Sequence, residues 1–273
     1  MIDTINLKKI LSEEKDSKVR EIKSSAYEGM ASSLLNYKEE YKYTPLLRKI
    51  EKKFNSLSPE KSLNKKIKDY KGLIPKSEKF YLFILNGNYQ ESLSNKPDNI
   101  LVSKYSKLSI KQKEEFSKSY SKYDDSKSDF FSSANTINHD DCLIIRIERN
   151  KALKENIAII NIIDSSQPTY FRKCIIVEKN SEISFSEEFI NSTNNISFSN
   201  TVSEIFLDEN SKLNYYSVQN MNKNYHFNSI NVLQKSNSTS NFHTYSFTGE
   251  IIRNNLNIKL EDKNCYANMY GFY

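Results

Sequence analysis

Two stretches near the middle of the chain, 177–185 (VEKNSEISF) and 207–215 (LDENSKLNY), repeat one pattern at a separation of 30 residues. In each, an apolar and an acidic residue lead to an asparagine, Asn180 or Asn210, and apolar residues then occupy alternate positions. Alternation with a period of two is typical of a β-strand that buries one face. The repeated unit is therefore predicted to be a polar turn followed by a half-buried strand.

The same pattern continues along the second half of the chain, centred on the asparagines Asn150, Asn180, Asn210, Asn237 and Asn264. They are 30, 30, 27 and 27 residues apart, and an acidic residue stands two positions before four of them. The inward positions should be those three and five residues after each asparagine, namely Leu153, Ile183, Leu213, Ser240 and Ala267, and Glu155, Phe185, Tyr215, Phe242 and Met269. Such a repeat, without helices, predicts a β-solenoid with coils about 4.8 Å apart. A β-sandwich with accidental asparagine spacing is the alternative.

Short β-rich runs separated by polar turns fill the chain after about Asp129, and no amphipathic stretch of helix length lies between them. The expected strands are Leu143–Ile147, Ile157–Ile163, Cys174–Val177, Ile196–Phe198, Val202–Leu207, Ser229–Leu233 and Ile251–Leu260. We therefore expect residues 129–273 to form the solenoid domain.

Residues 1–128 differ from the rest of the chain in charge and in hydrophobic periodicity, and they are expected to form a mainly helical domain. They carry 27 Lys and Arg against 18 Asp and Glu, a balance of +9, whereas the rest of the chain has a balance of −3. Apolar residues spaced by three and four begin at Leu7, Pro45 is well placed to start a helix, and residues 108–120 form a short amphipathic helix. Residues 80–85 (FYLFIL) are the exception, a buried strand that ends at the turn signal Asn86-Gly87.

Composition excludes several classes of protein. No apolar run approaches the roughly 18 residues that a membrane span requires, and the first five residues do not resemble a secretory signal. The five glycines are far apart, which excludes glycine-rich nucleotide-binding loops. The Lys-rich helices are interleaved with acids and lack an Arg-plus-aromatic platform, so nucleic-acid binding is not expected. A cytoplasmic protein with reduced thiols is the expectation.

No catalytic, cofactor-binding or metal-ligating residue is assigned from the sequence. Cys142, Cys174 and Cys265 are at least 32 residues apart and differ in repeat register, so we expect buried or turn thiols. His139 and His226 share a register but stand three coils apart, roughly 14 Å at one strand spacing per coil, too far to hold one metal ion. The paired acids at 140–141 are expected in an exposed turn.

Six short segments spread over almost the whole chain nevertheless carry a family resemblance. They are 41–46 (YKYTPL), 85–89 (LNGNY) followed by Leu93-Ser94, 129–136 (DFFSSANT), 143–162, 253–256 (RNNL) and 270–273 (YGFY). In this order they are similar to segments of the SufD branch of the SufB/SufD family of iron–sulfur cluster assembly proteins. Each match is weak alone, and the set is specific because the order is kept.

The resemblance implies a helical N-terminal domain followed by a right-handed parallel β-helix. It also implies a non-catalytic scaffold subunit of the SUF complex that acts with a SufB-like homologue and a SufC-like ABC ATPase. On this basis the chain itself is not an enzyme and holds no stable cofactor, although a transient iron–sulfur cluster is expected in the complex. No nucleic acid or membrane partner is implied.

The chain also departs from the family pattern. Tyr41 stands where the family usually has Trp, and family members continue past the position of Tyr273. We therefore expect the solenoid to be incomplete at its C-terminal end, without the segment that binds the partners, and no functional residue is carried over. A structural or adhesion β-solenoid is the main alternative function, and a carbohydrate-active β-helix enzyme is a lesser one.

Overall fold

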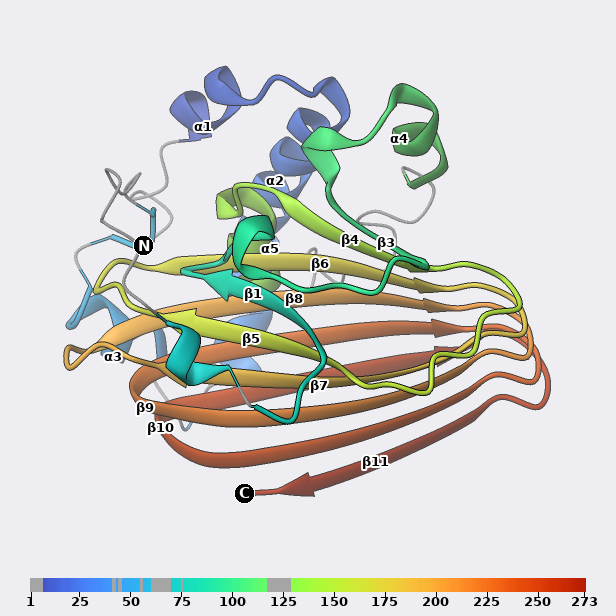
Figure 1. The fold of residues 1–273 in the computed structure, drawn as a ribbon. Helices are drawn as coiled ribbons and strands as arrows, with labels where there is room; N and C mark the ends of the chain where they lie inside the picture. The colour runs from blue at the N-terminus through green and yellow to red at the C-terminus, as the bar shows by residue number, and fades with distance from the viewer. Residues whose placement is uncertain are drawn as a thin grey trace.

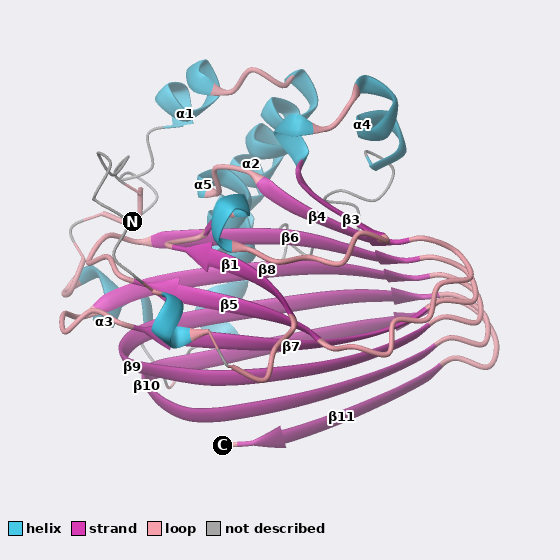
Figure 2. Ribbon diagram, in the orientation of Figure 1, coloured by secondary structure: helices cyan, strands magenta, loops and turns pink. Residues whose placement is uncertain are grey.

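The computed structural model describes residues 7–40, 43, 46–54, 56–59, 70–74, 76–116 and 129–273. The helices α1, α2 and α3 precede the first strand in the sequence and lie beside the strands (Figures 1 and 2). The helices are α1 (Leu7–Glu13), α2 (Ser17–Glu40), α3 (Leu46–Glu51), α4 (Ile110–Phe116) and α5 (Phe130–Asn138), with 3-10 turns at Lys71–Leu73, Glu91–Leu93 and Tyr105–Lys107. The strands are β1 (Phe80–Leu85), β2 (Asn88–Tyr89), β3 (Ile100–Lys104), β4 (Cys142–Ile147), β5 (Ile157–Ile163), β6 (Thr169–Val177), β7 (Glu182–Asn191), β8 (Ser197–Leu207), β9 (Lys212–Gln234), β10 (Thr239–Leu260) and β11 (Tyr266–Phe272).

The strands wind into a β-solenoid of about five turns, which confirms the predicted fold class. One wall consists of β1, β5, β7 and the first halves of β9 and β10, followed by β11. The facing wall consists of β3, β4, β6, β8 and the second halves of β9 and β10. All strand pairs in 129–273 are parallel. Because β9 pairs with β7 through its first half and β8 through its second, each long strand crosses from one wall to the other.

The predicted asparagine turns form one edge of the solenoid, at the right of Figure 1. All five asparagines have positive φ angles, between 56° and 60°, which asparagine tolerates better than most residues. Their side chains form a ladder, in which Asn180 Nδ2 donates to Asn150 Oδ1 at 2.9 Å and Asn210 Nδ2 donates to Asn180 Oδ1 at 3.0 Å. The serine after the asparagine adds a bond to a turn carbonyl, as Ser211 does to Asp208 at 2.6 Å.

The predicted register is confirmed by the pairing of strands and by burial. Ile183 pairs with Leu213 and Phe185 with Tyr215, and all four side chains are buried in one apolar core next to the turns. The first coil differs, because Ile157 rather than Glu155 pairs with Phe185. The prediction that Glu155 points inward was therefore wrong, since two extra residues in this turn leave it exposed. In the last described coil Met269 is also exposed, because β11 pairs only with β10.

Most predicted strands are found, and several are longer than expected. The two runs at Ile196–Phe198 and Val202–Leu207 belong to the single strand β8, and the runs at Ser229–Leu233 and Ile251–Leu260 are the second halves of β9 and β10. As expected, no helix lies between the strands from β4 to β11 within the described residues. The sequence analysis did not predict α5, which precedes β4. Its N-terminus is capped by Asp129, whose carboxylate accepts from the Ser132 amide at 2.8 Å.

The region before residue 129 supplies strands as well as helices. The predicted strand is β1, and its turn at Asn86-Gly87 forms a hairpin with β2. Gly87 has a φ of +80°, and a Cβ there would lie 2.2 Å from the Tyr170 carbonyl oxygen, so both conformation and space require glycine. β1 joins the solenoid by pairing in parallel with β5, and β3 pairs antiparallel with β4. The domain boundary near residue 129 stays a prediction.

Two predicted features lie wholly or partly outside the described residues. The first is the helix start at Pro45, because Pro45 and most of the segment 41–46 lie outside the described residues. The second is the expected helix 108–120, of which the structure describes a helix only over Ile110–Phe116, because residues 117–128 are not described.

Candidate functional site

Two of the three cysteines are buried and the third lies in a turn, as expected. The two buried ones, Cys142 and Cys174, belong to one core cluster on the adjacent strands β4 and β6, a proximity that the sequence analysis did not predict. Cys142 pairs across strands with Arg172 and Cys174 with Ile144, so the two buried thiols are not opposite one another. Burial raises the pKa of both thiols well above the usual value, which keeps them protonated and weakly nucleophilic. Cys265 is partly exposed, and its sulfur lies 3.1 Å from the Asp262 carbonyl oxygen, the place that serine takes in other turns.

The histidines lie in different surroundings. His139 follows α5 and is buried, with Nδ1 3.0 Å from the Asn135 carbonyl oxygen. His226 lies on β9, and β6 and β8 separate that strand from β4, the strand that follows His139. Within the part of the chain that the structure describes, no group of three or more His, Cys, Asp or Glu side chains could hold a metal ion. The paired acids lie in a turn, where Asp141 Oδ2 accepts from the Ser106 hydroxyl at 2.5 Å.

A polar cluster inside the solenoid is the first feature that the sequence analysis missed. Lys173 on β6 and Glu187 on β7 face each other from opposite walls, fully buried, with Nζ 2.7 Å from Oε1. Asn161 Nδ2 donates to the same Oε1 at 3.0 Å, and the Tyr215 hydroxyl donates to Oε2. Burial lowers the pKa of Lys173, although Glu187 opposes that shift, and burial together with Glu187 raises the pKa of Tyr215.

A second buried ion pair lies on the outer face of the same strand, because successive residues of a strand point to opposite faces. Arg172 donates to Glu204 on β8 at 2.5 Å and to the Thr136 hydroxyl of α5 at 2.9 Å. Asn135 of α5 donates to the carbonyl oxygens of Phe171 and Asn200 at 3.0 and 2.9 Å. This network attaches α5 to the solenoid wall and satisfies polar groups that the contact buries.

The interior therefore has two parts, which we name by their position between the walls. The turn half lies next to the asparagine turns and is apolar, as Ile183, Leu213, Val177, Leu207 and Val232 show. The bend half lies toward the opposite edge, where the long strands β9 and β10 bend from one wall to the other, and it is largely polar. Its inward polar side chains are Asn161, Lys173, Glu187, Ser199, Thr201, Ser217, Gln219, His226 and Asn228.

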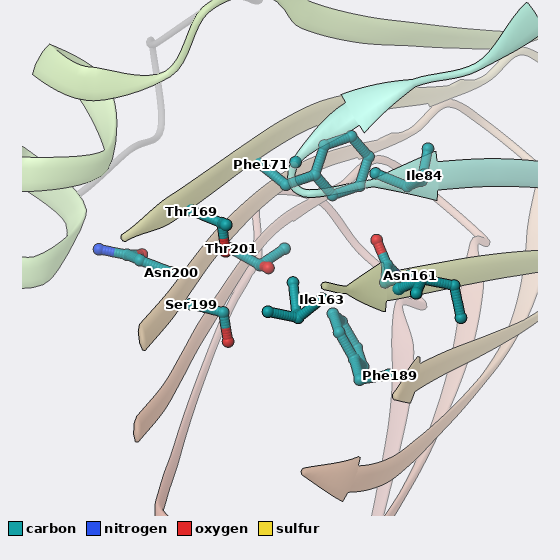
Figure 3. A pocket seen from close by; sticks show the side chains of 11 residues that line it. Ile84, Asn161, Ile163, Thr169, Phe171, Phe189, Ser199, Asn200 and Thr201 are labelled. Carbon is teal, nitrogen blue, oxygen red and sulfur yellow. The ribbon is translucent and has the colours of Figure 1, made fainter. Parts of the chain in front are cut away.

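A small hollow, with a volume of about 10 Å³, leads into the bend half and is partly open to solvent. Figure 3 shows Ser199 and Thr201 on one side of it and Asn161 on the other, with Ile163 in the middle, Phe171 above and Phe189 below. Gly87 of the β1–β2 turn also lines the hollow. Asn161 links the hollow to the buried ion pair through its bond to Glu187.

Hydrogen bonds assign the tautomer of His226, which lies beside this hollow. Asn224 Nδ2 donates to Ser197 at 2.7 Å, which turns Asn224 Oδ1 toward the Ser199 hydroxyl 2.8 Å away. With Asn224 in this orientation Ser199 uses its one proton there, and His226 Nδ1, 2.8 Å from Ser199 Oγ, is the protonated ring nitrogen. His226 Nε2 is then an acceptor. Burial, reinforced by the charge of Lys173, lowers the pKa of His226 to about 3.

This arrangement is poorly suited to nucleophilic catalysis. Although Ser199 and His226 are in contact, the histidine donates to the serine instead of accepting its proton, and its low pKa makes it a weak base at neutral pH. Alternation in the sequence could have revealed one member of the polar cluster. Glu187 continues the inward series Ile183, Phe185, so a charge at that position already signals a buried polar site.

Two family models match the chain, and together they cover almost all of it. Residues 6–159 match the SufBD protein N-terminal region, and residues 161–273 match the SufBD core domain of SUF system FeS cluster assembly. The chain belongs to the SufB/SufD family. Membership in that family indicates a part in SUF iron–sulfur cluster assembly. A search of curated proteins gives no match.

The SufB/SufD core match begins inside β5 and covers the coils that carry the polar cluster and the hollow. No helix within the described residues is both long and apolar enough to cross a membrane.

Proposed function

We propose that this protein is a non-catalytic, SufD-like scaffold subunit of the SUF machinery, which acts with a SufB-like homologue and a SufC-like ABC ATPase. The observation that carries the proposal is the match of both family regions, 6–159 and 161–273, to a chain that folds as the expected solenoid. The iron–sulfur cluster is then the cargo of the complex, and ATP hydrolysis belongs to the ATPase.

The state of the cysteines supports a SufD-like over a SufB-like role. A subunit that receives sulfur needs an accessible thiolate. Here Cys142 and Cys174 are buried with a raised pKa, and Cys265 lies against carbonyl oxygens of its turn. Cys142 and Cys174 are therefore poor acceptors of sulfur, as expected of a subunit that supports a homologous partner, and only the turn residue Cys265 is partly exposed.

Co-purification tests the proposal. The tagged protein, expressed from its full open reading frame, is produced together with the SufB-like and SufC-like proteins of the same organism and separated by size-exclusion chromatography. We expect one complex that contains all three proteins, with ATP hydrolysis only when the SufC-like protein is present. Elution of this chain alone, while the other two associate with each other, would overturn the proposal and favour a standalone structural solenoid.

A further inference from the structure

One wall of the solenoid has an outer face that is covered at one end and exposed at the other. This wall consists of β1, β5, β7, the first halves of β9 and β10, and β11, which run side by side in Figure 1. At the β1 and β5 end, the outward residues Phe83 and Ile160 are buried, with Tyr70 and Ile74 of this chain packed against them. The wall is therefore built with an apolar outer face that a further segment covers.

At the β11 end of the same face, the outward side chains are aromatic and exposed. The ring of His243 is stacked between those of Tyr216 and Tyr270, with centroids 4.8 and 4.7 Å away. Tyr270 and Phe272 are 58% and 60% exposed, and they point away from the interior, so a strand paired with β11 would not cover them. An exposed apolar patch of this kind marks an interaction surface. We name it the outer patch, and it consists of Tyr216, His243, Tyr245, Phe247, Tyr270 and Phe272.

A carboxylate lies in this apolar face, between its covered end and the outer patch. Glu188 on β7 pairs with Ile160 of β5 on one side and with Val218 of β9 on the other, and it is half-buried. Val218 in turn pairs with Tyr245 of the outer patch. Burial raises the pKa of Glu188, because apolar surroundings disfavour the charged form. A cation that a partner brings to Glu188 would offset this penalty, so the face favours a positively charged occupant.

The covered end of the wall shows which kind of segment fits such a face. Residues 70–76 (YKGLIPK) supply the aromatic and the aliphatic side chain that pack there, and two lysines accompany them in the sequence. An occupant of similar composition would pack apolar side chains on the outer patch and place a Lys or Arg on Glu188. A second copy of this chain fits less well, because a two-fold contact through the same patch would bring two copies of Glu188 into one interface.

We propose that the outer patch is a docking surface for a segment of a partner protein that carries aromatic or aliphatic residues and at least one Lys or Arg, whose cation pairs with Glu188. The surface lies on the outside of the solenoid. Because α5 contacts the other wall, through Phe171 of β6 and Asn200 of β8, the segment can dock without displacing that helix.

Peptide binding to the full chain, followed by NMR, tests the proposal. Two synthetic probes are compared, YKGLIPK and the same peptide with glutamate in place of both lysines. We expect the lysine peptide to shift the amide signals of Tyr216, His243 and Tyr270 and to bind about tenfold more tightly than the glutamate peptide. Glu188→Gln should reduce this difference to about twofold, because it removes the charge that distinguishes the two probes.

A matched pair of variants separates the outer patch from exposed apolar side chains in general. Tyr270→Ser should weaken binding of the lysine peptide about fivefold, because it removes apolar contact area. Ile110→Ser, which replaces an 80% exposed side chain of α4, should leave binding unchanged. No binding, equal binding of both peptides to the wild type, or signal shifts confined to residues outside the patch would overturn the proposal. So would a dimer in sedimentation that Tyr270→Ser dissociates, because the patch would then join two copies of this chain.

Discussion

The turn half and the bend half of the solenoid are built by the same strands with the same alternation, yet one is apolar and the other is polar. In the turn half, Ile183 and Leu213 are buried among other hydrocarbon side chains. In the bend half, the corresponding inward positions hold Lys173, Glu187 and Asn161, which satisfy one another. The comparison teaches that strand alternation determines which side chains point inward, whereas hydrogen bonding determines whether a polar side chain is tolerated there.

The largest effect is expected from a charge placed in the turn half. Leu213→Asp would put a carboxylate where no polar partner exists among the described residues, and we expect it to lower the free energy of unfolding by about 5 kcal/mol. Lys212→Asp is the matched control on the outer face. Lys212 pairs with Glu182 at 2.8 Å, with both side chains nearly half exposed, so its loss should cost about 0.5 kcal/mol. Equal destabilisation in urea melts would contradict the register.

Breaking the ion pair of the bend half should be nearly as damaging. Glu187→Ala leaves the Lys173 ammonium and the Tyr215 hydroxyl buried without their acceptor, and we expect a loss of about 4 kcal/mol in urea unfolding. The double variant Lys173→Met, Glu187→Gln removes both charges; the glutamine oxygen still accepts from Asn161, and its NH2 group donates to the Tyr215 hydroxyl. The free energy of unfolding of this double variant should be within about 1 kcal/mol of the wild-type value. A double variant as unstable as Glu187→Ala would show that the charges themselves stabilise the interior.

Acid should destabilise the bend half through His226. Its pKa is about 3 in the folded protein and 6.5 in an unperturbed chain, so between these values the unfolded state binds a proton that the folded state does not. Stability is therefore lost as pH falls below 6.5, by about 3 kcal/mol at pH 4.5. His226→Gln should remove this part of the pH dependence, whereas Ser199→Ala, which keeps the buried ring, should retain it. Unfolding curves at pH 7.5 and 4.5 that change equally for all three proteins would exclude the effect.

The smallest effect is expected at the turns that border the turn half. Asn210 has a φ of 56°, and Asn210→Ala should cost about 1 kcal/mol, because alanine is strained in that conformation and cannot bond to Asn180. Asn210→Gly removes the strain and should cost less than the alanine variant. Thermal unfolding of the two variants measures the difference in their stability. A glycine variant less stable than the alanine variant would contradict the claim that strain at a positive φ angle is the main cost of Asn210→Ala.

The sequence predicted the turn half well and the bend half poorly, for a physical reason. Asparagine at a fixed period marks the positive-φ turns, and the apolar residues that follow each turn define the register. The partners in the bend half, such as Lys173 and Glu187, come from different strands on opposite walls. No regular spacing in the sequence predicts that these two side chains form an ion pair. Likewise Arg172 bonds to Glu204 of β8 and to Thr136 of α5, a helix that was not predicted from the sequence.

Family membership was indicated by segments such as 85–89 and 129–136, and family models match both parts of the chain. The absence of an assigned catalytic or ligand residue stays a prediction. The hollow and the tautomer of His226 could not be deduced from the sequence, because both depend on which side chains adjoin across strands.

Depletion of this protein in its own cells tests the assembly role most directly. The account predicts that the activity of iron–sulfur enzymes falls on depletion, and that the wild type and Lys212→Asp restore it while Leu213→Asp does not. Unchanged activity of iron–sulfur enzymes after depletion, in cells that hold no second copy of the gene, would contradict it.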